Sequence, residues 1–284
     1  MLPKKDITAS ELDLKSLATD LPVKAVLPSF ERLKVTVSDE QYIVPHQLQP
    51  YRNTLDNVLK QKGMFNGNSM VIKGDVEVPL TLYKGGFFDF KATQLTAIPA
   101  DLLRDKYPSG KTISELLPQY GLDVNQTARY LGFAFIMLTS NDNEISFVQR
   151  AKGLGIAADC MALSGATPPF HEDFLKKDFD FPGYFRKVIE REMAEEYKLS
   201  PNELRIGSCY LIDDKKSVPF IAIEITTPPS TKEIAERCYG DQDIIKEHPI
   251  LYATSLSAVP TLIRRFPLLP SSAYVMDKVA KQTE

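Results

Sequence analysis

The second half of the chain contains several short segments rich in apolar residues, separated by polar turn residues. This pattern predicts strands over 131–139 and 144–150, joined by the turn Ser140-Asn141-Asp142-Asn143 into a hairpin. A third strand is predicted over 158–166, and it closes on the small residues Ser164-Gly165.

A helix is predicted after these strands, where apolar residues recur at helical spacing. Within 184–197 the apolar positions are those of a one-sided amphipathic helix, namely Phe185, Val188, Ile189, Met193 and Tyr197. Strands over 204–212 and 218–227 follow, then a helix over 231–238 and a C-terminal pair of helices spanning about 255–281. Strands on both sides of an amphipathic helix predict an α/β sandwich.

The first half of the chain predicts a smaller unit of mixed structure. The pattern indicates a strand, a helix, a strand pair and a mostly helical polar segment, over 31–37, 50–62, 69–83 and 99–128. The character of the sequence changes near residue 125. We therefore expect an N-terminal α+β module over 1–125 and a second domain over 126–284, which has an ordinary domain size.

Composition and charge narrow the class of protein. The 284 residues are 43% hydrophobic and 25% charged, with a formal net charge of −3. Without a basic excess, neither nucleic acid nor an anionic membrane surface is an expected partner. No apolar run is long enough for a membrane span, and the polar N-terminus does not predict a secretory signal. Three widely spaced cysteines fit reduced thiols, so a cytoplasmic location is expected.

The run 191–199 carries the candidate chemistry. If it is helical, Glu192, Glu195 and Glu196 share one turn, and Glu192 and Glu196 lie about 40° apart around the axis. Like charges at that spacing repel by roughly 0.2–0.5 kcal/mol per pair. A hard divalent cation would remove that repulsion, because Mg²⁺ prefers oxygen ligands. The alternative is that these glutamates form a solvent-exposed charged face on an ordinary helix.

The residues Arg191-Glu192-Met193-x-Glu195-Glu196 resemble the second half of the Nudix signature. The resemblance implies a Nudix-type α/β/α sandwich with a mixed sheet, and one or more Mg²⁺ or Mn²⁺ ions. It implies that Glu192 and Glu196 are metal ligands and that Glu195 acts directly or through water. Arg191 would orient the carboxylates, and Glu195 and Arg191 are the implied catalytic residues.

The match to the signature is incomplete upstream of the helix. Lys177 and Gly183 occupy the positions of the first signature glycine and glutamate, and Lys198 occupies that of the last glycine. Gly165 is the natural substitute for the first glycine and completes the expected metal site, although an insertion then separates it from the helix. Glu172 within this insertion is the candidate replacement for the upstream glutamate.

A second resemblance lies in the first half of the chain. The segment from Phe87 to Gln94 is similar to one that precedes the catalytic domain in the UDP-glucose pyrophosphatase branch of the Nudix proteins. Phe88 and Phe90, at alternate positions, are expected in the core of a small sheet. Asp89 between them would face either solvent or a ligand.

Together these observations favour a Mg²⁺-dependent pyrophosphohydrolase that cleaves the diphosphate of a nucleoside diphosphate linked to another moiety. A nucleotide sugar such as UDP-glucose is the expected substrate class, and a homodimer is compatible with the sequence. The alternative is a catalytically impaired Nudix-fold module that binds a nucleotide or a protein. Weaker site candidates are His171, Asp241 and the pair Arg264-Arg265.

Overall fold

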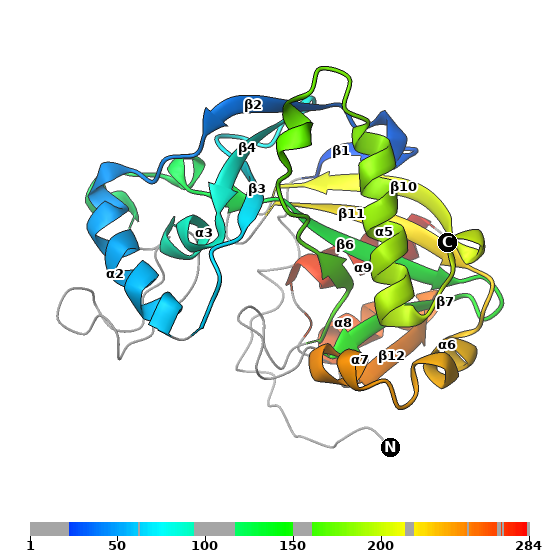
Figure 1. Cartoon of the computed structure of the whole chain (residues 1–284). Coiled ribbons are helices and arrows are strands. Elements are labelled where there is room, and N and C mark those ends of the chain that lie inside the picture. Colours follow the sequence, from blue (N-terminus) through cyan, green and yellow to red (C-terminus); the bar gives the residue numbers. More distant parts are fainter. Residues whose placement is uncertain are drawn as a thin grey trace.

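The computed structural model describes residues 23–61, 63–93, 117–149, 161–213, 219–248, 250–265, 268 and 270–282. Two predicted segments lie partly outside these residues: 99–116 of the helical segment over 99–128, and the first part of the strand over 158–166. The described remainder of the helical segment forms two short 3-10 helices, Leu117–Tyr120 and Val124–Gln126. Two β-sheets, each with its own helices, lie side by side in Figure 1. No helix in the described ranges has the length and apolar character that crossing a membrane requires.

The larger sheet is mixed, with the strand order β1-β10-β11-β6-β7-β12. Strand β6 runs parallel to β11 over its whole length, from Gly132 beside Phe220 to Thr139 beside Thr227, whereas the other pairs are antiparallel. The short strands β8 and β9 pair with β7 and β6. The bounds are Val23–Leu27 (β1), Gly132–Thr139 (β6), Glu144–Gln149 (β7), Met161–Ala162 (β8), Ser164–Ala166 (β9), Arg205–Ile212 (β10), Phe220–Thr227 (β11) and Ile250–Ser255 (β12).

Helices cover both faces of this sheet. Along β6, Phe135 belongs to the core beneath helix α5 (Phe181–Tyr197), whereas Ile136 belongs to the core beneath α9 (Pro270–Gln282). This alternation follows from the two-residue period of a strand. Figure 1 shows α5 in front of the sheet and α9 behind it, so the α/β/α sandwich with a mixed sheet is confirmed. The remaining helices of this part are α6, α7 and α8, over Thr231–Cys238, Gln242–Glu247 and Val259–Arg265.

The smaller sheet has the strand order β2-β4-β3-β5. Its strands are Val35–Gln41 (β2), Asn68–Ile72 (β3), Leu80–Gly86 (β4) and Arg129–Tyr130 (β5), with helices α2 (Gln49–Gln61) and α3 (Phe87–Thr93). Strand β1 precedes this unit in sequence but pairs with β10 of the larger sheet. The division at residue 125 stays a prediction, while strand pairing places the change of sheet between Tyr130 and Gly132.

Two local predictions need correction. The Phe87–Thr93 segment is helix α3 and not a strand, although Phe88 and Phe90 are buried as expected. Alternate apolar positions within so short a segment fit either element, and packing against α2 decides for the helix. The described part of the third strand is divided into β8 and β9, which pair with different neighbours.

A buried ion pair joins the two sheets. Arg129 on β5 donates from Nη2 to Asp213, which directly follows β10, and both side chains are fully buried. Arg129 Nη1 also donates to the carbonyl oxygen of Gly74 at 3.1 Å, and Lys24 Nζ lies 3.7 Å from the other Asp213 oxygen. Because neither charge reaches water, each depends on the other.

Candidate functional site

Helix α5 begins and ends through local features of its sequence. The Asp180 carboxylate accepts a hydrogen bond from Gly183 N at 2.9 Å, and Pro182 occupies the first turn. A Cβ atom at Gly183 would collide with this carboxylate, which explains a glycine where the signature has glutamate. At the other end, Lys198 has φ 55° and ψ 35°, the left-handed conformation. The signature glycine is therefore the residue that this position favours.

Substitution of Lys198 tests this explanation. We expect Lys198→Gly to be more stable than Lys198→Ala by about 1 kcal/mol, because only glycine adopts the left-handed conformation without strain. Both variants lose the ion pair of Lys198 Nζ with Asp241 at 2.7 Å, so the comparison isolates the backbone. The check is the urea midpoint at a constant slope. Equal stability of the two variants would contradict the explanation.

The carboxylates of Glu192 and Glu196 are largely buried on the last two turns of α5. Their side chains are 15% and 12% exposed, so they do not form a solvated charged face. Glu195, by contrast, is exposed. Arg191 Nη2 donates to Glu192 Oε1 at 2.6 Å. The orienting role that the resemblance implies for Arg191 stays a prediction.

Glu196 is held by groups from three segments that are distant in sequence. Ser164 Oγ on β9 donates to Glu196 Oε2, and His248 Nε2 lies 3.2 Å from Glu196 Oε1. Cys238 at the end of α6 lies against the same turn, with its Sγ 3.5 Å from the Glu196 carbonyl oxygen. Ser164 and His248 are therefore site residues that the sequence interpretation missed. No local pattern marks them, because contact with Glu196 arises only in the folded chain.

Gly165 lies beside this cluster, in the strand that carries Ser164. It pairs with Ala134 on β6, and a Cβ atom at Gly165 would collide with the carbonyl oxygen of Phe133. Glycine is thus required for the close approach of β9 to β6. This approach places the strand end next to the turn of α5 that bears Glu196.

Burial raises the pKa of Glu192, and the nearby Glu196 charge raises it further, while the hydrogen bond from Arg191 opposes both effects. Two carboxylates in a desolvated position are a suitable donor set for a hard cation such as Mg²⁺ or Mn²⁺. Within the described part of the chain, however, no three His, Cys, Asp or Glu side chains converge as a complete metal site requires. The carboxylates of Glu192 and Glu196 are nevertheless suited in chemistry to a divalent cation.

The raised pKa of Glu192 predicts a pH-dependent stability. A carboxyl group with a folded-state pKa above its unfolded value destabilises the fold where it is ionised, and this cost disappears as the pH falls through the folded pKa. Without divalent cations, Glu192→Gln should therefore raise the free energy of unfolding at pH 7–8 by about 0.5–1 kcal/mol. The gain should shrink toward pH 4–5. Urea denaturation across this range checks it, with the exposed Glu195→Gln as the control, and a destabilised Glu192→Gln at pH 8 would contradict it.

Glu172 does not join the acidic pair. It lies in a 3-10 turn, Glu172–Leu175, where its exposed carboxylate is paired with Lys84 of β4. Phe174 in this turn packs on Phe181 at the start of α5. Glu192 lies about 16 Å along the helix axis from Phe181. Glu172 is therefore not seen beside the acidic pair, and it is paired with Lys84 instead.

The other weak candidates with described side chains, Asp241 and His171, make contacts that do not involve the acidic pair. Asp241 is the N-cap of α7 and accepts from Asp243 N and Ile244 N, and the Lys198 ammonium holds its pKa below the usual value. His171 in the insertion packs edge-on against Phe174 and against Tyr184 of α5. The side chains of Arg264 and Arg265 lie outside the described set. The segment after α6 therefore reaches the end of α5 at two points: Asp241 pairs with Lys198, and His248 contacts Glu196.

Comparisons with known proteins give distant structural likenesses. No protein-family profile matches the chain, and no curated protein matches it in sequence. Among solved structures, a MutT protein of Methanosarcina mazei is 13% identical over 54% of this chain and 94% of its own, with a TM-score of 0.37. The DR0079 protein of Deinococcus radiodurans is 8% identical over 53% and 82%, with a TM-score of 0.38. The NUDIX domain of Shewanella oneidensis NrtR, solved with ADP ribose, is 14% identical over 66% and 99%, with a TM-score of 0.33.

Proposed function

We propose that this protein is a Nudix-type hydrolase of phosphoric anhydride bonds that depends on Mg²⁺ or Mn²⁺. The observation that carries the proposal is the largely buried pair Glu192 and Glu196, held one turn apart on α5 beside the Ser164-Gly165 strand end. Two carboxylates are rarely buried together unless something compensates their charge. Arg191 pairs with Glu192, and Ser164 and His248 contact Glu196, so a bound divalent cation would compensate the charge that remains on the pair.

The residues of the site divide the chemistry between them. Glu192 and Glu196 would hold the ion, with Glu195 and the Gly165 backbone as the further ligands that the resemblance implies. The ion, when bound, neutralises phosphate charge and activates water. Water would attack one phosphorus while the bridging P–O bond breaks, which yields a nucleoside monophosphate and a second phosphate. Ser164 and His248 keep the Glu196 carboxylate in place, and Arg191 does the same for Glu192.

The proposed substrate is a nucleoside diphosphate linked to another moiety, and a nucleotide sugar is the leading class. Support for the sugar comes from the similarity of the Phe87–Gln94 segment to the UDP-glucose pyrophosphatase branch. A cytoplasmic location, a homodimer and the absence of nucleic acid as a partner remain predictions from the sequence.

The direct test is a hydrolysis panel with the full chain. Nucleotide sugars, dinucleotides and nucleoside triphosphates are incubated with Mg²⁺, with Mn²⁺ and with EDTA, and the products are separated by chromatography. We expect a nucleoside monophosphate from at least one diphosphate-linked substrate and none with EDTA. Absence of turnover on the whole panel with either ion would overturn the proposal.

One observation favours the alternative, a module that binds nucleotides without cleaving them. Glu172 is paired with Lys84, so the described residues place no upstream glutamate beside Glu192 and Glu196. Calorimetry with ADP-ribose and UDP-glucose separates the two functions. Binding without product over hours would establish the non-catalytic module, and binding with product would establish the hydrolase.

A further inference from the structure

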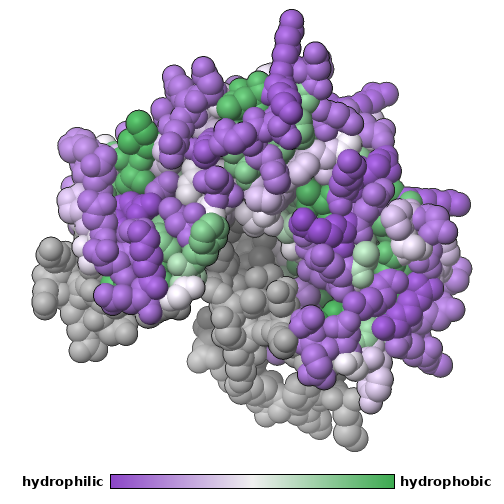
Figure 2. Space-filling model, in the orientation of Figure 1, coloured by the Kyte–Doolittle hydropathy of each residue, from purple (hydrophilic) through white to green (hydrophobic). Residues whose placement is uncertain are grey.

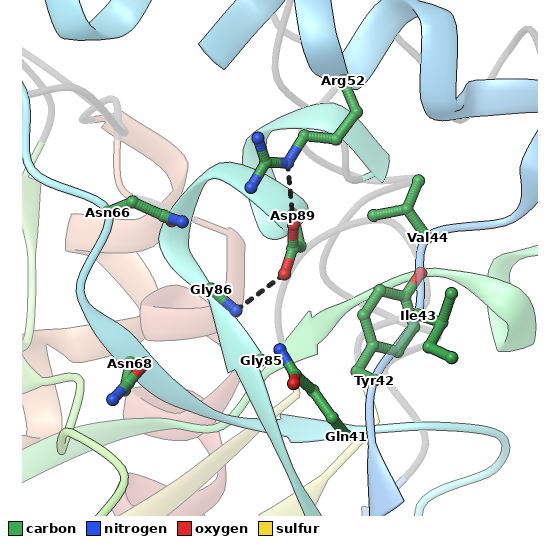
Figure 3. A pocket seen from close by; sticks show the side chains of 10 residues that line it. All are labelled: Gln41, Tyr42, Ile43, Val44, Arg52, Asn66, Asn68, Gly85, Gly86 and Asp89. Carbon is green, nitrogen blue, oxygen red and sulfur yellow. Dashed lines mark hydrogen bonds and ion pairs between the residues drawn. The ribbon is translucent and has the colours of Figure 1, made fainter.

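A polar cavity of about 380 Å³ lies beside the smaller sheet, at the ends of β2 and β4 and next to α2 and α3 (Figure 3). Its polar side chains come from separate segments: Gln41, Arg52, Asn66, Asn68 and Asp89. This volume lies within the range of about 300–1,000 Å³ that is typical of small-molecule sites. None of the lining residues belongs to α5 or β9, so the cavity is distinct from the acidic pair.

An ion pair with fixed geometry lies at the centre of the cavity. Arg52 Nε donates to Asp89 Oδ1 at 2.8 Å, and Gly86 N donates to Asp89 Oδ2 at 2.9 Å. Arg52 Nη1, on the other side of the guanidinium, lies 3.0 Å from Asp56 Oδ1. Asp56 is also paired with Lys60 Nζ at 2.6 Å, so two cations and two carboxylates balance one another. The described lining therefore offers no unpaired cation to a phosphate or carboxylate ligand.

Glycine at position 86 keeps this arrangement open. A Cβ atom there would lie 2.8 Å from Asn66 Oδ1 and 3.1 Å from Asp89 Oδ2. Asn66 Oδ1 already accepts from Phe88 N at 2.7 Å, so its amide NH₂ remains as a donor toward the cavity. Figure 3 shows the amides of Asn66 and Gln41 turned toward Asp89.

We propose that this cavity binds a sugar ring. A sugar hydroxyl donates and accepts hydrogen bonds at once, which matches the Asp89 carboxylate acceptor next to the Asn66 and Gln41 amides. The internally balanced charge favours a neutral ligand over an anion. Ile43 at the edge is 76% exposed, and it offers an apolar surface for the C–H face of a ring. The ring can come from a free monosaccharide or from a nucleotide sugar.

The test is ligand-observed NMR on the full chain with glucose, galactose, N-acetylglucosamine, UDP-glucose and UDP, supported by calorimetry. The double variant Gln41→Ala/Asn68→Ala removes two amides that, among the described residues, have no hydrogen-bond partner inside the protein. We expect it to weaken sugar binding about tenfold, since each lost hydrogen bond contributes about 0.5–1.5 kcal/mol. Asn53→Ala is the matched control, because Asn53 is an exposed amide on α2 outside the cavity.

The outcomes separate the sources of the ligand and the two sites. Binding of a monosaccharide that is lost in the double variant and kept in Asn53→Ala identifies a site for free sugars. If the double variant loses UDP-glucose binding while UDP binding is unchanged, the ligand of the cavity is the sugar ring of a nucleotide sugar. Equal effects on UDP and UDP-glucose, or no effect of the double variant, would overturn the sugar assignment. Anhydride cleavage assayed on a nucleoside triphosphate reports on the α5 site separately.

Discussion

The variant Glu196→Gln should lower the turnover of the best diphosphate substrate by about 10²–10³-fold, the loss expected when one preorganised charge contact is removed. Glutamine keeps the size of the side chain and can still accept from Ser164 Oγ, so the helix should remain folded. What disappears is the second negative charge of the pair, on which the binding of a divalent cation depends. The measurement is kcat and KM with Mg²⁺, together with the Mg²⁺-induced rise in melting temperature, which the variant should also lose.

A matched control lies on the same helix. Glu190→Gln makes the same chemical change on α5, outside the Glu192–Glu196 pair, and should leave kcat within about twofold, as is typical of a substitution away from the reacting groups. Unchanged turnover in Glu196→Gln would remove that carboxylate from the mechanism. Loss of turnover together with loss of helical circular dichroism would instead assign Glu196 a structural role.

Asp213→Asn should destabilise the protein by about 3–5 kcal/mol, the largest stability effect that we expect for a single charge. The change leaves the guanidinium of Arg129 fully buried without its carboxylate, and a buried unpaired charge is far more costly than a broken surface pair. Because Arg129 lies on β5 and Asp213 follows β10, the loss should also loosen the junction of the two sheets. Urea denaturation monitored by circular dichroism gives the difference in the free energy of unfolding.

Two further variants show whether burial is the cause of the stability lost in Asp213→Asn. The double change Arg129→Met/Asp213→Leu removes both charges and should recover most of the lost stability. Glu31→Gln breaks the exposed ion pair between Glu31 and Arg186, and it should cost less than about 1 kcal/mol. A cost for Asp213→Asn as small as that of Glu31→Gln would show that water reaches Arg129.

Most regular elements of the larger sheet follow from local pattern. The hairpin of β6 and β7, the strands β10 and β11, and the helix α6 lie within a few residues of their predicted positions. These segments are short apolar runs or helically spaced apolar residues bounded by turn residues, and the packing of the folded chain agrees with that local pattern. Helix α5 starts at Phe181, earlier than the apolar pattern indicates, because Asp180 and Pro182 begin it. Strand β12 was not predicted, since its residues are only partly buried and carry little alternation.

The candidate site, too, could be predicted only in part from the sequence. The acidic pair could be predicted, because residues four apart on a helix share a face whatever surrounds them. The surroundings could not: Ser164 and His248 are far from Glu196 in sequence and reach it through sheet pairing and the course of the chain after α7. For the same reason, the ion pair of Glu172 with Lys84 could not be predicted from the spacing of residues along the chain.

By itself, the sequence determined the helix and the identity of its carboxylates, because these depend on neighbours within one or two turns. Only the tertiary structure decided which carboxylates are buried, what holds Glu196, and how Arg129 and Asp213 meet across two sheets. Burial and long-range pairing depend on how distant segments pack, and local periodicity carries no information about that packing.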